Sequence, residues 1–284
     1  FLFEAAVAGG IPIIRPLKQC LAGNDLTDIL GIVNGTTNYI LTKMDKEGET
    51  FESALKEAQD LGYAERNPEA DVEGHDTCRK IAILTAMATG HEVDYEDIHT
   101  EGITSISDVD FKYAEKMGTS VKLFGSSRIK AGEIHAWVAP VMIGKDHPLY
   151  SVSDVFNGIL VKGNMLGTSM FYGSGAGMLP TASAVIADII EAVQNRNRHV
   201  EMGWDDSRLA IAPTQTSSSR FFIRIKGIAE ERLAEVLKVF GDVTVIELDH
   251  MDEFAVVTDV MTEAEYEKKA KELSGIRQRI RAEV

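Results

Sequence analysis

Residues 58–80 read AQDLGYAERNPEADVEGHDTCRK and combine features that ordinary surface helices do not. Five carboxylates fall within twelve positions, and the stretch then ends on Arg79 and Lys80. Gly62, Asn67-Pro68 and Gly74 interrupt it, which predicts a shaped polar turn rather than one continuous helix. Such a turn would bring carboxylates and one ammonium to a common point. That point suits a small zwitterionic substrate, because carboxylates hold an amine and a lysine acts on an oxygen.

Composition and charge exclude several classes of partner. The 284-residue chain has 29 Lys and Arg against 44 Asp and Glu, giving a net charge of −15, and 44% of its residues are hydrophobic. This hydrophobic fraction can fill a buried core, and the length favours two domains. An acidic surface repels phosphate backbones and anionic lipid, so we expect no nucleic-acid and no membrane partner. No apolar run approaches the roughly 20 residues that span a bilayer.

The cysteines are informative about the cellular compartment, and the first residues about the N-terminus of the protein. Cys20 and Cys78 form no CxxC or Cys/His ligand spacing, so we expect free thiols in a cytoplasmic protein. The chain begins at Phe1 with the apolar run FLFEAAVAGGIPIIRPL, which is typical of the middle of a fold and not of a signal peptide. We therefore expect a portion of the protein N-terminal to Phe1 to be missing.

Periodicity predicts an α+β fold with a mixed or antiparallel sheet and helices on one face. The predicted strands are residues 28–33, 134–142, 158–162 and 168–172. The predicted helices are residues 38–46, 51–61, 71–88 and 181–193. Asp71 is the expected N-cap of the third helix, and Gly90 is expected to close it.

A second unit is predicted after a polar, irregular linker at residues 196–215. Its predicted elements are strand 221–225, helix 230–240, strands 243–248 and 254–258, helix 262–273 and a last strand at 276–280. This is the element order of a ferredoxin-like domain. We thus expect one domain at residues 1–208 and a small second domain at residues 217–284.

The glycine-rich loop GSGAG at residues 173–177 precedes a predicted helix. Such a loop can present backbone N–H groups and a helix N-terminus to a phosphate. A tight turn explains the same residues more simply, so the residues by themselves favour a turn.

Asp76 and Lys80 are four residues apart and would project from one face of a helix. Alone, such a pair is typical of a surface ion pair worth only about 0.3–0.5 kcal/mol. Glu65 and Asp71 lie nearby, and clustered acids favour the protonated ammonium, which can donate a proton or stabilise an oxyanion. His75 and Cys78 have no partners at ligand spacing, so we expect no transition-metal site.

The pattern A-x3-GYA-x2-NP-x2-DV-x-G-x-D-x3-K over residues 58–80 resembles the signature of homoserine dehydrogenases. GIVNGTTNYI at residues 31–40 and FEAAV at residues 3–7, through Pro12, resemble further blocks of that family. The match is specific and extends to about residue 200. The tail resembles an ACT domain, a small ligand-sensing module often fused to enzymes of amino-acid biosynthesis.

The resemblance implies NAD(P)H-dependent interconversion of aspartate 4-semialdehyde and homoserine, in the pathway to threonine, methionine and isoleucine. By position, Lys80 would donate a proton to the aldehyde oxygen as hydride arrives, and Asp76 would orient Lys80 and keep it charged. Glu65 and Asp71 would bind the amine of the substrate. Three further residues would shape the pocket: Tyr63, Gly35 and Thr36.

The resemblance also implies a cofactor, a cation and a partner. Gly175 would lie near the dinucleotide, which is NADP or NAD. A monovalent cation, sodium or potassium, would bind backbone carbonyls matching Glu4, Val7, Gly9 and Ile11; the residues by themselves indicate only an apolar turn there. A homodimer or a higher homo-oligomer is expected.

Two departures from the family pattern matter. No GxGxxG motif follows an N-terminal strand, so the dinucleotide-binding fold is absent from this chain, and we expect the 284 residues alone to be inactive. ACT domains usually carry an Asp-x-Pro-Gly-like turn after the first strand, whereas residues 226–231 read KGIAEE. A dimerisation surface without threonine binding is therefore favoured for the tail.

Two other functions remain open. One is a non-catalytic, amino-acid-sensing regulatory protein with the tail as its sensor. The other is a different NAD(P)-linked amino-acid dehydrogenase, although an amine site at Glu65 and Asp71 disfavours substrates that lack an amine.

Overall fold

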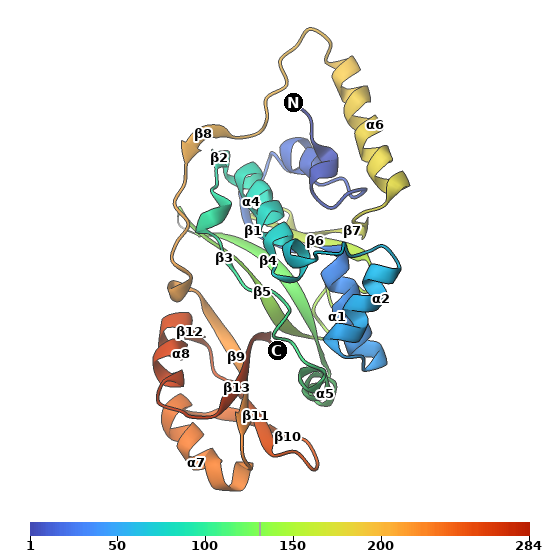
Figure 1. The fold of residues 1–284 in the computed structure, drawn as a ribbon. Coiled ribbons are helices and arrows are strands. Elements are labelled where there is room, and N and C mark those ends of the chain that lie inside the picture. Colours follow the sequence, from blue (N-terminus) through green and yellow to red (C-terminus); the bar gives the residue numbers. More distant parts are fainter. Residues whose placement is uncertain (131) are drawn as a thin grey trace.

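The computed structural model describes residues 1–130 and 132–284 and has an α+β fold (Figure 1). Its main strands belong to one mixed sheet with the order β10-β11-β9-β13-β5-β4-β1-β6-β7. In chain order these strands are β1 (Leu26–Ile32), β4 (Thr119–Lys130), β5 (Glu133–Gly144), β6 (Phe156–Gly163), β7 (Gly167–Ser174), β9 (Ser218–Lys226), β10 (Val243–Glu247), β11 (Glu253–Thr258) and β13 (Ile276–Glu283). Two short strands pair at its side: β3 (His99–Thr100) with β5 and β12 (Met261–Thr262) with β9.

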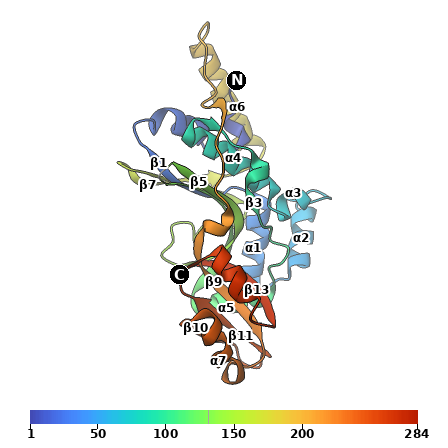
Figure 2. The ribbon, with the colours of Figure 1, turned by 90° about the vertical axis from the view of Figure 1, so that its left-hand side faces the viewer.

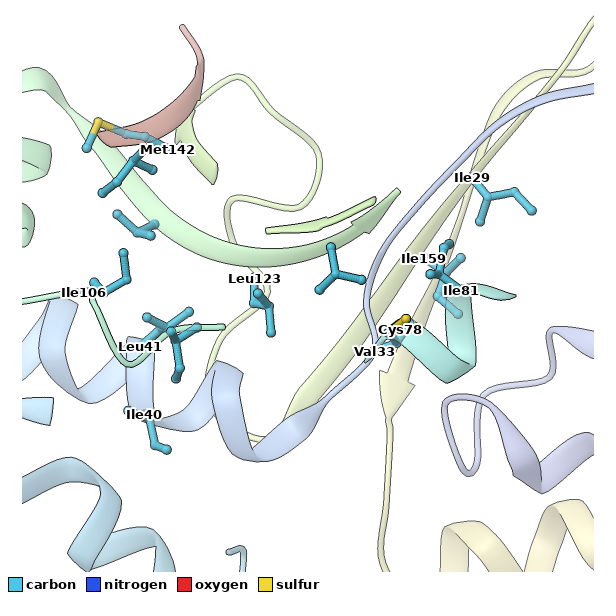
Figure 3. Close-up of a cluster of buried hydrophobic side chains, with 14 of the residues drawn as sticks. Ile29, Val33, Ile40, Leu41, Cys78, Ile81, Ile106, Leu123, Met142 and Ile159 are labelled. Carbon is cyan, nitrogen blue, oxygen red and sulfur yellow. The ribbon is translucent and has the colours of Figure 1, made fainter. Parts of the chain in front are cut away.

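Helices cover one face of the β1, β4, β5 and β6 portion of this sheet. They are α1 (Gly35–Glu47), α2 (Phe51–Asp60), α3 (Glu69–Val72), α4 (His75–Thr89) and α5 (Asp108–Met117). Buried residues of α1, α4 and the sheet form the main core, in which Val33, Cys78, Ile81 and Ile159 lie close together (Figure 3). The opposite face is covered by the loop after β5, through Leu149 and Val152. The predicted fold class is confirmed at this level, including helices on one face of this portion.

Most predicted elements of the first 208 residues form, with one informative error. The predicted helix at residues 71–88 is interrupted, because Gly74 takes a left-handed conformation (φ 81°) between α3 and α4. Asp71 therefore lies inside α3 and is not an N-cap, so that prediction was wrong. Glycine tolerates this φ without the Cβ penalty of other residues, which explains why the chain turns there. The break turns the predicted single helix into a bent pair whose inner side carries Asp71 and Asp76.

The C-terminal residues form a βαββαβ unit. The strands β9, β10, β11 and β13 alternate with α7 (Ala229–Phe240) and α8 (Glu263–Ala270), which pack on one side of them. Their spatial order, β10-β11-β9-β13, is the antiparallel order of a ferredoxin-like unit. The last strand, β13, also pairs in parallel with β5 from Arg281 opposite Val141 to Glu283 opposite Ile143. Hydrogen-bonded strands therefore run without a break from the C-terminal unit into the rest of the sheet.

The predicted linker contains a strand, and the helix before it projects from the sheet. The predicted linker contains β8 (Asp205–Arg208), which pairs in parallel with β2 (His91–Glu92). Before it, α6 (Met178–Gln194) projects beyond the sheet at the end opposite the C-terminal unit (Figure 2). None of the helices formed by the described residues is both long and apolar enough to cross a membrane.

Candidate active site

Lys80 and Asp76 form the charged centre of the site. They lie one turn apart on α4, and Lys80 Nζ donates to Asp76 Oδ2 at 2.6 Å. Lys80 Nζ also donates to the carbonyl oxygen of Val33 at 2.9 Å, just after β1. The two side chains are 20% and 32% exposed, so the pair lines an accessible surface and is not part of the core. The predicted projection of both side chains from one helix face is confirmed.

Asn34 joins this pair to Asp71. Its Nδ2 donates to Asp71 Oδ1 at 2.7 Å and to Asp76 Oδ2 at 2.8 Å. Its Oδ1 accepts the backbone N–H of Thr37 at 2.8 Å and so caps the N-terminus of α1. One buried amide therefore fixes two carboxylates and one helix end. Asn34 had no predicted role, although an Asn between a strand and a helix is the usual sign of an N-cap.

Asp71 has an unusual electrostatic environment. Burial raises its pKa, and the neighbouring Asp76 charge adds to that rise, while the hydrogen bond from Asn34 opposes it. A cation within reach of both Asp71 and Asp76 would stabilise the ionised form of Asp71. The geometry thus presents a partly buried acid next to a lysine that already has two acceptors.

The predicted pocket residues gather beside Asp71. Thr36 Oγ1 donates to the carbonyl oxygen of Tyr63 at 2.7 Å, and the ring of Tyr63 packs edge-on against Tyr39 with centroids 5.0 Å apart. Gly35 lies against the backbone of Val155, since a Cβ at Gly35 would lie only 3.0 Å from that carbonyl oxygen. The structure therefore brings together Gly35, Thr36, Tyr63, Asp71, Asp76 and Lys80.

Glu65 is placed differently. It is exposed on the turn after α2, and among residues 1–130 and 132–284 its carboxylate makes no hydrogen bond or ion pair. Its backbone oxygen accepts from Gln59 Nε2 at 3.1 Å, which fixes the turn but not the side chain. The structure does not join Glu65 to Asp71 by any direct contact.

A second group of predicted residues lies where the first turn meets the glycine-rich loop. The backbone of Gly9 abuts Gly175, because a Cβ on Gly9 would overlap the carbonyl oxygen of Gly175. Gly10 N–H donates to the carbonyl oxygen of Ser174 at 3.2 Å. A Cβ on Gly175 would overlap Oδ1 of Asn157, so only glycine fits there. The buried amide of Asn157 has no hydrogen-bond partner among the described residues.

The fit of a monovalent cation and of a dinucleotide can be judged from these atoms. The Glu4 carboxylate already accepts the backbone N–H groups of Ile13, Ile14 and Arg15 at 2.7–2.9 Å, so it is not an available ligand. In the part of the chain that the structure describes, no hydrogen bond outside helices and strands ends on the carbonyl oxygens of Val7, Gly9 or Ile11. Main-chain oxygens suit a hard cation, and the glycines of the loop allow close approach of a dinucleotide. No His, Cys, Asp or Glu cluster for a metal ion occurs among residues 1–130 and 132–284.

Comparisons with known proteins identify the family of this chain. The family model described as homoserine dehydrogenase matches residues 12–190. A homoserine dehydrogenase from Synechocystis sp. is 54% identical over 196 residues, covering 68% of this chain and 45% of that protein. The crystal structure of a homoserine dehydrogenase from Thiobacillus denitrificans is 34% identical with a TM-score of 0.89, covering 99% of this chain and 69% of that one.

A further solved structure contributes a ligand to the comparison. A hyperthermophilic archaeal homoserine dehydrogenase mutant, in complex with NADPH, is 34% identical with a TM-score of 0.57, covering 67% of this chain and 55% of that one. The chain spans about half the length of the curated relatives that it matches. The family match and these structural similarities together show that this chain belongs to the homoserine dehydrogenase family.

Proposed function

We propose that this chain carries the substrate-binding and proton-transfer groups of a homoserine dehydrogenase. The enzyme would interconvert aspartate 4-semialdehyde and homoserine with NADPH or NADH, in the pathway to threonine, methionine and isoleucine. The observation that carries the proposal is the arrangement of Lys80, Asp76, Asn34 and Asp71 on one accessible surface. Membership of the family supports it.

Asp71 binds the ammonium group of the substrate. Its carboxylate is held by Asn34 and partly buried, and burial raises its pKa, so an arriving ammonium relieves an unfavourable charge. Glu65 lies on the exposed turn after α2, and its side chain would rotate toward the same ammonium when substrate binds. Tyr63, Gly35 and Thr36 form the wall of the pocket between them.

Lys80 supplies the proton for the aldehyde oxygen. An ammonium has three N–H donors, and Lys80 uses two of them on Val33 and Asp76, so one is left for substrate. Asp76 orients the ammonium through the hydrogen bond that it accepts from Nζ. Proton donation at this oxygen and stabilisation of the developing alkoxide charge lower the barrier together.

A nicotinamide cofactor, NADP or NAD, would supply the hydride when bound. Gly175 and its loop would lie against it, and the apolar face of α6 would pack on a companion nucleotide-binding domain. Several large apolar side chains of α6 are exposed in this chain: Met178, Leu179, Val185, Ile186, Ile189, Ile190 and Val193. Backbone carbonyls at Glu4, Val7, Gly9 and Ile11 would hold a sodium or potassium ion beside that loop.

The assembly is a homodimer or a higher homo-oligomer in a cytoplasmic enzyme. The face of β6 and β7 away from the helices exposes Phe156, Met170 and Tyr172, and the rings of Phe156 and Tyr172 stack with centroids 5.5 Å apart. An exposed apolar surface of this kind is typical of an interface between subunits. Both cysteines are free thiols, which fits a reducing compartment.

Residues 217–284 form an ACT-type unit in this proposal. The βαββαβ order and its strand arrangement support that assignment. The turn after β9 keeps Gly227 (φ 104°) but lacks the Asp and the Pro-Gly pair, so the unit serves assembly more than effector binding. Calorimetry with threonine tests this part, and saturable heat of binding would contradict it.

The function is tested by a substrate panel with the full-length protein. We expect NADPH-dependent reduction of aspartate 4-semialdehyde and slow reduction of succinate semialdehyde, which lacks the amine. Equal rates on both aldehydes would favour another dehydrogenase. Threonine binding without any dehydrogenase activity would favour the regulatory protein.

A further inference from the structure

A cluster of charged side chains joins the last strand of the C-terminal unit to the segment behind the active site. Glu101 follows β3, and its Oε1 accepts from Arg279 Nη2 at 3.2 Å and from Arg281 Nη2 at 2.9 Å, both on β13. His99 Nε2 lies 2.7 Å from the same oxygen. Arg281, whose side chain is 3% exposed, also donates from Nε to Glu263 Oε1 at 2.6 Å. None of the proposed chemical steps uses these residues.

The backbone next to Glu101 lies directly against the turn that carries Asp71. Ile103 N–H donates to the carbonyl oxygen of Val72 at 2.7 Å. A Cβ on Gly102 would overlap that same carbonyl oxygen, so the two backbones are in close contact. A Cβ on Gly74, at the end of the turn, would lie 3.3 Å from the carbonyl oxygen of Glu101. The turn and residues 101–103 are therefore in direct backbone contact, so a movement of either segment toward the other would produce a clash.

The segment has two attachments of its own. Glu101 N–H donates to the carbonyl oxygen of Val138 in β5 at 2.8 Å, which fixes one edge of the backbone. The side chain of Glu101 fixes the other edge through Arg279 and Arg281. A carboxylate shared by two guanidinium groups makes charge-assisted hydrogen bonds, which are stronger and more directional than neutral ones.

We propose that Glu101 is a positioning residue through which the C-terminal unit holds the Asp71 turn in its substrate-binding position. This inference rests on the proposed function, in which Asp71 binds the substrate ammonium. The unit then sets the affinity for the amino substrate without touching it. Lys80 is affected much less, because its Nζ is fixed by Asp76 on its own helix and by Val33 on β1.

The test compares two glutamate variants of the full-length protein in homoserine oxidation. Glu101→Gln keeps the size and the hydrogen-bonding oxygen but removes the charge. Glu133→Gln is the matched control, since Glu133 also pairs with a histidine, His135, at 3.7 Å but is 74% exposed. For Glu101→Gln we expect the KM for homoserine to rise about tenfold while kcat and the KM for the nucleotide stay within about threefold. In the control variant we expect kcat, the KM for homoserine and the KM for the nucleotide to be unchanged.

Amide hydrogen exchange gives a second readout that does not depend on activity. The Ile103 amide should exchange about tenfold faster in Glu101→Gln than in the unaltered protein, and at the same rate in Glu133→Gln, because its hydrogen bond to Val72 opens more often. Arg279→Gln removes one of the two guanidinium partners of Glu101 and takes the place of Glu101→Gln in the test if that variant does not fold. We expect Arg279→Gln to raise the KM for homoserine selectively as well, by a smaller factor.

The contradicting results are distinct from a failure of the proposed function. An unaltered protein that does not oxidise homoserine would reject the function, and the exchange rate of Ile103 would still test the role of Glu101. A folded Glu101→Gln with unchanged homoserine KM and unchanged Ile103 exchange would overturn the inference. An equal rise in the KM for homoserine and for the nucleotide would overturn it too, since that indicates general loosening.

Discussion

Two of the ion clusters in this protein have similar chemistry but differ in exposure. In the proposed active site, Lys80 has two acceptors, and both it and Asp76 are partly exposed. At the junction between α5 and the C-terminal unit, Arg224 donates to Ser107, to Asp110 and twice to Glu253, and the two carboxylate side chains are 0% exposed. Burial opposes ionisation of Glu253, but hydrogen bonds from Arg224 and Arg277 outweigh it and hold its pKa below the ordinary value. The buried cluster holds structure, whereas the partly exposed one has a donor on Lys80 within reach of a ligand.

The largest expected effect is on stability, at the buried cluster. Arg224→Met should lower the free energy of unfolding by about 3–5 kcal/mol, because it leaves two buried carboxylates with fewer partners. Arg220→Met is the control, since Arg220 pairs with Asp259 at 3.9 Å and both side chains are exposed; it should cost less than about 1 kcal/mol. Urea unfolding of the two variants measures the difference. Equal costs would remove the distinction between the clusters.

The next effect is kinetic and concerns Asp76. Asp76→Asn should lower kcat about tenfold, since Lys80 loses its charged acceptor while Asn34 keeps an oxygen to bind. Thermal unfolding should change little because the pair is partly exposed. Asp60→Asn, in the exposed Lys56–Asp60 pair with the same four-residue spacing, should leave kcat unchanged. A large stability loss without loss of kcat would place Asp76 with the structural cluster.

A smaller effect is expected at Asn34. Asn34→Ala removes the cap of α1 and should cost about 1–2 kcal/mol of stability. Thr50→Ala removes the exposed cap of α2, where the Ser53 N–H lies 3.3 Å from the Thr50 hydroxyl oxygen, and should cost less. Only Asn34→Ala should also weaken homoserine binding, because Asp71 loses its donor. Parallel unfolding and binding measurements compare the two caps.

Much of the active site follows from local sequence, and the errors have a physical cause. The spacing of Asp76 and Lys80 predicts their contact, because one helix turn fixes it. Alternation predicts β5, because a period of two is also a local property of the chain. A turn at Gly74 was expected from the stretch at residues 58–80, although the predicted helix 71–88 ran through it. Asn34 had no predicted role, because that role depends on a residue far along the chain: Asn34 bonds Asp71, 37 positions away. Glu101 and Arg281 are separated by 180 positions, and only the folded sheet brings them together.

The smallest expected effect is a stabilisation. Burial raises the pKa of Asp71, so the folded state favours its protonated form and the ionised group destabilises the protein at neutral pH. Asp71→Asn should therefore raise the free energy of unfolding at pH 7, by less than about 1 kcal/mol because water screens a partly buried group. This gain should shrink as the pH falls through the raised pKa of Asp71 in the folded protein, and it should vanish below the ordinary Asp value of 3.8, where the group is protonated in both states. Unfolding measured at several pH values checks the sign, and a loss of stability at pH 7 would contradict it.

The most direct test of the account is the single-turnover rate of Lys80→Ala in the full-length protein at saturating homoserine. We predict a rate at least about 100-fold lower than that of the unaltered protein, with the Kd for homoserine within about threefold, because Lys80 acts on the reacting oxygen and Asp71 holds the amine. Lys56→Ala, which breaks the exposed pair of the same spacing, should change neither value. An unchanged turnover rate with a weakened Kd would show that Lys80 only binds substrate, and would contradict the account.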